Sequence, residues 1–307
     1  MSSHPIVVSV PNGDLDPALR FAATEAALHD TPVRLIHAYE PGPSLSGPPV
    51  TQAGANEVLR RALQRAEEIL GPDIEVSGGL VRGPAVEAVL DASQEAWLVV
   101  LQRRDLLHLI RSLTRSMDRA AVRRSHVPLV CVPPTEVPTA GGRPVTVGID
   151  ATEHSAALLR AAATIAHERG APLRVLHTWS FPKPYDEQVL LRVGREWEAW
   201  AREDIENVLR GSPVRDAVQI DIEIHHGPPL PALLAAAETS RLMVLGRHGV
   251  HRALGSRLGP VTRAVLHDAP CPVLLLPTAE YVEPPSGLAD ARAHDRSHRE
   301  THSGTRA

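Results

Sequence analysis

Short apolar runs alternate with longer alanine-rich stretches along most of this chain. The runs are rich in β-branched side chains, which indicates buried strands, and the stretches between them carry apolar residues at helical spacing. Strands alternating with helices predict an α/β fold with parallel sheets covered on both faces. The predicted strands are 6–10, 33–39, 74–81, 97–101 and 129–132, then 145–149, 173–179, 218–224, 242–245 and 273–276. The predicted helices are 17–29, 56–70, 84–93 and 116–124, then 155–169, 187–209, 229–239 and 260–267.

The pattern occurs twice because the sequence itself is duplicated. Residues 98–101 align with 242–245, and 128–130 align with 272–274, both 144 positions later. Near the start, residues 5–10 align with 144–149 at an offset of 139. An ordered series of matches with a slowly growing offset indicates a tandem repeat with small loop insertions.

The chain length of 307 residues suits two domains, each large enough to bury a core. A segment rich in proline and glycine, 133–142, separates the copies and indicates a linker. We therefore predict a first domain over 1–138 and a second over 139–280. Residues 281–307 are polar with few large apolar side chains, which predicts a disordered tail.

Composition and charge exclude several classes of protein. A net charge of −4 argues against a general nucleic-acid binder, and no apolar run is long enough to span a membrane or to act as a secretion signal. The two cysteines, Cys131 and Cys271, lie in apolar segments at non-equivalent repeat positions, so we expect buried thiols and no disulfide. A cytoplasmic location is expected. Lys183 is the sole lysine, so a P-loop lysine is absent.

The second copy carries one glycine motif that the first lacks. It is Gly246-x2-Gly249-x9-Gly259, placed between a strand and a helix that begins at Pro260. Glycines at a strand end let a ligand approach the backbone, and a helix N-terminus favours an anion. Arg247 adds a cation suited to phosphate. The alternative is that these glycines form tight turns only, but three at this spacing favour a phosphate site.

These residues carry a resemblance. With the segment 265–274 that follows it, the motif resembles that of the universal stress proteins, and the likeness extends to the strand ending at Asp150, to 176–179 and to Gly227-Pro228. It covers nearly all of 5–277 as two tandem copies. The resemblance implies two Rossmann-like domains of the adenine nucleotide alpha hydrolase type, each with a five-stranded parallel sheet of order 3-2-1-4-5, and ATP at the strand ends, with or without Mg²⁺.

The resemblance also implies a role for each matching residue. An aspartate at the position of Asp150 lies beside the nucleoside, and the backbone at Thr178 holds the adenine. The residues implied around ribose and phosphates are Gly246, Gly249, Gly259, Val261 and Thr262. One departure is Pro260, where the family has serine or threonine. Proline fits a first helical turn, but it removes a hydroxyl and a backbone N–H from the phosphate site.

The first copy lacks most of this site. Pro11 replaces the aspartate, and Gln102, Asp105 and Arg115 replace the three glycines. A carboxylate and two long side chains would occupy the space for phosphates, so we expect no ligand in the first copy.

Two functions remain open. The first is a regulatory protein of a stress response that binds ATP through its second domain, and the second is a nucleotide-independent assembly scaffold. No arrangement typical of a catalytic nucleophile or a metal site is identified, and weak ATP hydrolysis is a less favoured third interpretation. The apolar segments 129–132 and 273–276 end their copies as sheet edges that need cover. We expect them to pair within one chain, with a homodimer as a further arrangement.

Overall fold

The computed structural model describes residues 4–11, 13–43, 49–83, 89, 91, 94–103, 127–134, 142–150, 155–180, 186–247 and 258–277, side chains within 186–193 excepted. Several expectations lie outside these ranges. They are the predicted helix 116–124, nearly all of the predicted helix 84–93, Gly249, Asp105, Arg115 and the tail 281–307.

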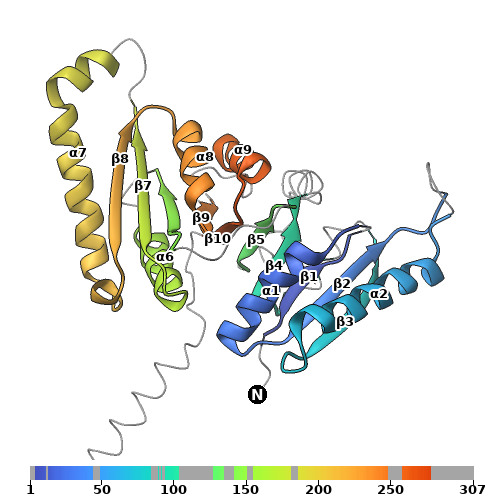
Figure 1. Cartoon of the computed structure of the whole chain (residues 1–307). Coiled ribbons are helices and arrows are strands. Elements are labelled where there is room, and N and C mark those ends of the chain that lie inside the picture. Colours follow the sequence, from blue (N-terminus) through green and yellow to red (C-terminus); the bar gives the residue numbers. More distant parts are fainter. Residues whose placement is uncertain are drawn as a thin grey trace, which may run out of the picture.

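The described strands form one sheet of ten, in the order β3-β2-β1-β4-β5-β10-β9-β6-β7-β8 (Figure 1). Pairing is parallel within β1–β5, the first half, and within β6–β10, the second half. Each half therefore has the order 3-2-1-4-5, as the resemblance implied. The strands are β1 (Ile6–Ser9), β2 (Val33–Tyr39), β3 (Val76–Arg82), β4 (Leu98–Gln102), β5 (Leu129–Val132), β6 (Val145–Ile149), β7 (Leu173–Trp179), β8 (Ile220–His226), β9 (Leu242–Arg247) and β10 (Val273–Pro277).

Helices cover both faces of the sheet, and each face has its own core. One core joins the sheet to α1 (Asp16–His29), α2 (Gln52–Leu70), α6 (Ala156–Glu168) and α7 (Asp186–Arg210). The other core joins it to α8 (Pro229–Thr239) and α9 (Pro260–Asp268). A short 3-10 turn, η2 (Arg215–Ala217), precedes β8. The predicted α/β fold is confirmed, with element ends within a few residues of the sequence estimate.

The two halves meet where β5 and β10 pair antiparallel, which we call the seam. Cys131 lies opposite Val273 and Leu129 opposite Leu275 in this register. All eight side chains of β5 and of 273–276 in β10 are buried, so the apolar cores run across the seam without a break. The expected pairing of 129–132 with 273–276 within one chain is what the structure has. Cys131 and Cys271 are buried free thiols, as predicted.

On the α8–α9 face, two arginines cross the seam in opposite directions. Arg247 donates to the carbonyl of Val127 with an N–O distance of 2.6 Å, and Arg103 donates to the carbonyl of Ala269. Arg103 and Arg247 are 144 positions apart, so they are equivalent residues of the repeat. Each half therefore contributes the same arginine to hold the other half, as expected of a two-fold related pair.

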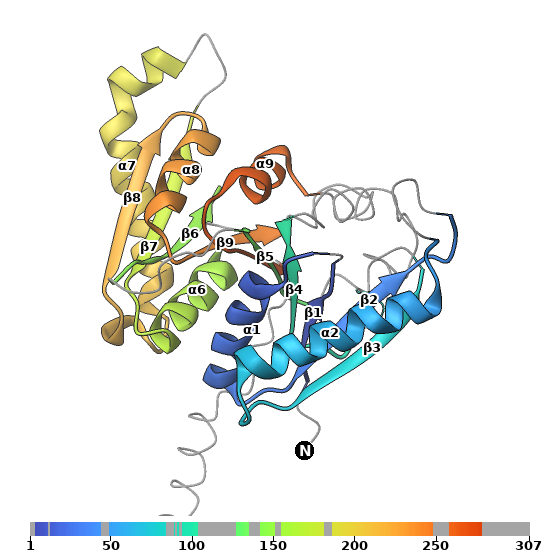
Figure 2. The same ribbon diagram turned by 45° about the vertical axis from the view of Figure 1, so that its right-hand side comes forward.

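On the α1–α6 face, the seam holds a buried ion pair. Arg169, which caps the C-terminus of α6, donates to the carboxylate of Glu25 on α1, and Glu25 is 2% exposed. His29 lies 3.9 Å from Glu25 and 4.0 Å from Glu168, and it stacks on Trp97 with ring centroids 4.3 Å apart. Burial, with the nearby Arg169, lowers the pKa of His29 to about 4. α1 and α6 thus lie side by side (Figure 2).

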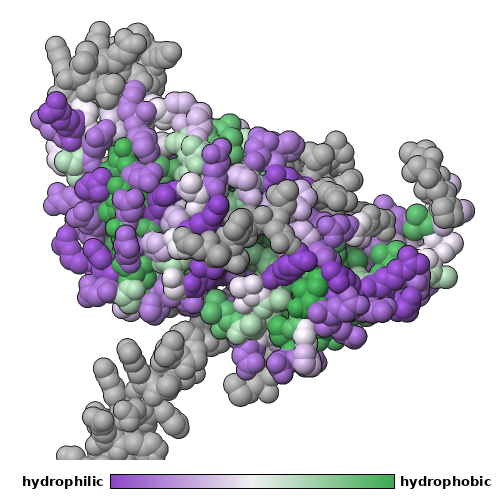
Figure 3. Space-filling model, in the orientation of Figure 1, coloured by the Kyte–Doolittle hydropathy of each residue, from purple (hydrophilic) through white to green (hydrophobic). Residues whose placement is uncertain are grey.

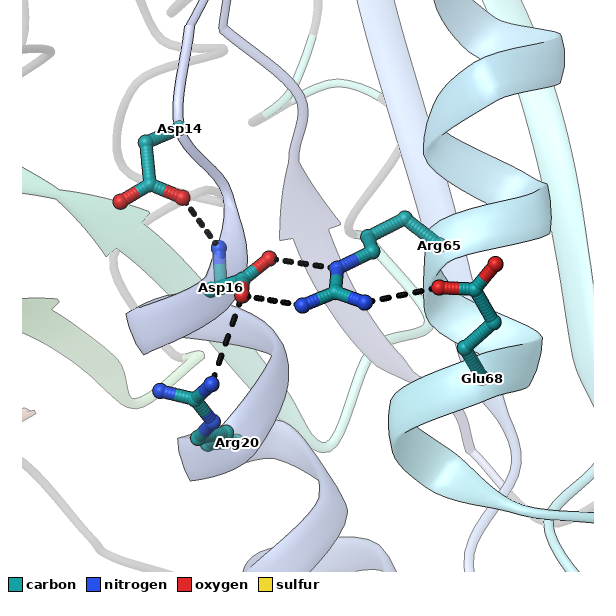
Figure 4. Close-up of polar contacts among 5 residues, drawn as sticks. All are labelled: Asp14, Asp16, Arg20, Arg65 and Glu68. Carbon is teal, nitrogen blue, oxygen red and sulfur yellow. Dashed lines mark hydrogen bonds and ion pairs between the residues drawn. The ribbon is translucent and has the colours of Figure 1, made fainter.

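A second set of ion pairs fixes α1 to α2 within the first half (Figure 4). Arg65 of α2 donates to both oxygens of Asp16, at 2.8 and 2.5 Å, and to Glu68 at 2.7 Å. The hydrogen bond from Arg65 lowers the pKa of Asp16. The backbone N–H of Asp16 in turn donates to Asp14, so the loop after β1 is held as well. The outer side of α2 is correspondingly hydrophilic (Figure 3).

Candidate nucleotide site in the second half

The site residues expected from the sequence follow three strands at the same edge of the second half. Asp150 comes directly after β6, Thr178 is the second-last residue of β7, and Gly246 is the second-last residue of β9. Parallel strands place their carboxyl ends at one sheet edge. β6 lies between β7 and β9, so the strands that follow it in the chain lie on both of its sides in the sheet. Such a switch point is where ligands of α/β sheets bind.

The N-terminus of α9 faces the same edge. α9 ends at Asp268, just before β10 begins at Val273, so it runs opposite to the strands and starts at their carboxyl ends. The N–H of Arg263 bonds to the carbonyl of Gly259 at 3.0 Å. The N–H groups of Val261 and Thr262 precede this first helical bond, so they have no partner within the helix. Two backbone donors and the positive end of the helix dipole suit an anion here.

Gly259 leaves space in front of these donors. Its φ of −61° and ψ of 160° are ordinary for any residue, so the backbone does not require glycine. A Cβ added to it would meet no heavy atom within 4 Å among the described residues. Neither the backbone conformation nor the described neighbours of Gly259 therefore require a glycine here.

A buried histidine supports the strand end beside Asp150. The Nδ1 atom of His177 lies 3.3 Å from the carbonyl oxygen of Ile149, the last residue of β6. Burial lowers the pKa of His177, while this backbone contact and the charge of Asp150 oppose the shift. Asp150 itself is exposed at the strand end.

Thr178 borders a groove of about 500 Å³ that extends between β7, β8 and α8. His226, Gly227 and Pro228 line it at the strand end, and alanines of α8 line it further along. Gly227 has a φ of 134°, which favours glycine, and its N–H bonds to the carbonyl of Trp179 at 2.9 Å. This volume is within the range of small-molecule sites.

Arg247 lies differently from its expected role. Its side chain is buried and directed across the seam to Val127, and burial lowers the pKa of its guanidinium to about 10. The sequence indicated a phosphate ligand because the residue follows the motif's first glycine. Arg247 is equivalent to Arg103, and both side chains hold the seam. Only the backbone of Arg247 lies at the strand-end edge. Gly249 lies outside the described residues.

Comparison with known proteins identifies the family. A family model described as the universal stress protein family matches residues 3–133 and again residues 142–277. The chain belongs to the universal stress protein family. Universal stress protein Rv2005c of Mycobacterium tuberculosis is 28% identical over 290 residues, which is 89% of this chain and 96% of the relative.

Solved universal stress proteins share the fold. The crystal structure of one from Archaeoglobus fulgidus matches with a TM-score of 0.58 at 15% identity, covering 91% of this chain and all of that chain. Another structure of a universal stress protein from the same organism is a complex with dAMP. It is 24% identical, covers 43% of this chain and 99% of that chain, and has a TM-score of 0.30.

In the first universal stress protein repeat, a side chain stands at the position equivalent to Gly246. Gln102, which replaces Gly246, is buried, and its side-chain amide donates to the carbonyl of Asp14 at 2.5 Å. The amide thus bridges from the end of β4 to the loop after β1, which is itself held through Asp16 and Arg65 (Figure 4). The side chain of Gln102 therefore occupies this corner in the first half. In the second half Gly246 has no side chain and makes no such bridge.

The sequence interpretation missed the contribution of two groups. His177 and its equivalent His37 each contact a backbone carbonyl at or just beyond the end of the neighbouring strand, with Nδ1 of His37 2.9 Å from the carbonyl oxygen of Val10. Their recurrence at equivalent positions was the available signal. The pair of Glu25 with Arg169 has no such signal, because the two residues are far apart in the chain and belong to different repeats.

Proposed function

We propose that the second half binds ATP, with or without Mg²⁺, and that this binding regulates the protein in a stress response. The observation that carries the proposal is the start of α9, where no side chain caps the helix and a Cβ at Gly259 would meet no described heavy atom within 4 Å. The triphosphate would lie over the N–H groups at this helix start and the backbone at Gly246 and Gly249. The adenine would lie beside the backbone of Thr178, and the ribose beside Asp150.

The residues present fit a nucleotide. The groove beside Thr178 has a wall of alanine and proline suited to a base, and a helix N-terminus without a side-chain cap suits the phosphates. The polar side chains that we assign to the site are those of Asp150 and Thr262, which suit binding more than turnover. We therefore propose a regulator and not an enzyme. No helix of the described residues is both long and apolar enough to cross a membrane.

A nucleotide-independent scaffold is the second candidate. The filled corner at Gln102 and the extensive seam favour it for the first half, whose role we propose to be assembly. The two candidates differ only in what the second half binds, and a titration with ATP separates them.

Serine in place of Pro260 tests the site directly. The Pro260→Ser variant gains an N–H and a hydroxyl at the start of α9, and each donor to a charged group contributes about 1.5–3 kcal/mol. We expect calorimetric titration at fixed magnesium and salt to show ATP bound about tenfold or more tightly than by the unaltered chain.

Pro17→Ser is the matched control, because Pro17 lies in the first turn of α1 in the half that is not expected to bind. It should leave the ATP affinity unchanged. Equal affinities for the unaltered chain and Pro260→Ser would contradict a phosphate position at this helix start.

A further inference from the structure

Two cavities flank the seam on the side of α1 and α6, and they occupy equivalent places in the repeat. Four residues that line the smaller cavity are each 144 positions away from a residue that lines the larger one. In three of these pairs the residue of the smaller cavity comes first in the chain, and in the fourth it comes second. The pairs are Trp97 with Arg241, Leu98 with Leu242, Pro128 with Pro272, and Leu276 with Val132. Duplication of one fold has therefore produced a pair of related cavities.

The two cavities differ greatly in volume. Trp97 stacks on His29 and reduces the smaller cavity to about 20 Å³. Arg241 stands at the equivalent position of the larger cavity, which has a volume of about 390 Å³. The arginine side chain extends to the carbonyl of Arg169, at 3.1 Å, and leaves the space that an indole ring would fill.

The larger cavity, which we call the seam cavity, has an excess of cationic groups. Arg20, Arg169 and Arg241 line it together with the carboxylate of Glu25, and Arg20 also pairs with Asp16 at 3.4 Å. Glu25 accepts a hydrogen bond from Arg169, and the contact recorded for the Arg241 guanidinium is with a backbone carbonyl. Burial, and then the neighbouring charge of Arg169, lowers the pKa of Arg241, while the charge of Glu25 opposes the shift.

Most other lining residues are apolar. They include Phe21, Ile69, Val132 and Leu242, and Thr24 is a polar exception. A cavity with an apolar wall and a few convergent charged groups is the usual form of a small-molecule site. An inorganic ion would satisfy the guanidinium and leave the apolar wall in contact with water.

We propose that the seam cavity binds a small amphipathic organic anion, whose carboxylate or sulfonate pairs with Arg241 and whose apolar body packs against Phe21 and Ile69. Its position between α1 and α6 means that such a ligand contacts both halves of the chain. The site is separate from the nucleotide edge, and this inference does not rest on the proposed ATP site.

The probe for this test is 8-anilinonaphthalene-1-sulfonate, titrated into the full chain with fluorescence as the readout. We expect saturable binding at one site, about tenfold tighter than that of N-phenyl-1-naphthylamine, which has the same apolar body without the sulfonate. Arg241→Gln should remove that preference for the anion. Arg241→Trp, which copies Trp97, should abolish binding of both probes.

Arg210→Gln, at the exposed end of α7, is the matched control and should bind the sulfonate as the unaltered chain does. Thermal unfolding of each variant shows whether it is folded. If Arg241→Trp does not fold, Arg241→Gln alone tests the proposal. Sulfonate affinity that is the same in Arg241→Gln and Arg210→Gln would overturn the proposal. So would equal affinity for the charged and neutral probes, or the absence of saturable binding.

Discussion

Replacing Glu25 by alanine is expected to lower the free energy of unfolding by about 3 kcal/mol or more. The reason is that the carboxylate is buried and its partner Arg169 is buried with it, at 3% and 8% side-chain exposure. Removing the carboxylate leaves the buried Arg169 with the longer contact to Glu168, at 3.9 Å, in place of its close partner, and breaking a buried pair typically costs about 3–5 kcal/mol. Urea unfolding of the full chain measures the change.

Glu57→Ala is the control for this variant. Glu57 also pairs with arginines, Arg60 and Arg61, but on the exposed side of α2, so its loss should change the stability far less than the loss of Glu25. The double variant Glu25→Leu with Arg169→Met should recover much of the lost stability, because apolar side chains of similar size replace a buried pair at little cost. Equal effects of Glu25→Ala and Glu57→Ala would show that the pair contributes nothing particular to the seam.

Gly259→Arg is expected to abolish ATP binding while the chain stays folded. The arginine copies Arg115 of the first repeat and would extend over the N–H groups of Val261 and Thr262. Loss of two hydrogen bonds to a charged ligand, at about 1.5 kcal/mol each or more, lowers the affinity at least about a hundredfold. The backbone of Gly259 accepts any residue, so the melting temperature should change little.

Gly211→Arg adds the same side chain just beyond α7 and should leave ATP binding intact. Gly259→Ala should fold normally as well, because its methyl group meets no described atom. If Gly259→Arg binds ATP as well as Gly211→Arg does, the start of α9 is not where the phosphates lie.

The sequence predicted most of this fold because duplication doubled the signal. Strands such as β2 and β7 have the predicted bounds in both copies, since short buried apolar runs bounded by proline leave little freedom. Parallel order 3-2-1-4-5 came from the resemblance and not from periodicity, because periodicity does not specify which strands are neighbours. The starts of β3 and β8 were placed two residues early, because an apolar residue, Ile74 or Val218, lies two positions before the first residue of each strand.

The site was predicted less completely, for a physical reason that Arg247 illustrates. Motif spacing places a residue along the chain, but the direction of a long side chain depends on what packs against it in three dimensions. At Arg247 the neighbour is the other half of the chain, so the guanidinium crosses the seam. The same reason explains why Glu25 and Arg241 had no signal in the sequence, since their surroundings exist only once the halves pair.

The central claim is that the chain binds ATP at one place, in its second half. Calorimetric titration of ATP into the unaltered full-length protein, at fixed magnesium and salt, tests it most directly. Our account predicts saturable binding of one ATP per chain, because Gln102 fills the equivalent corner of the first half. Two ATP per chain, or no heat of binding at millimolar ATP, would contradict it.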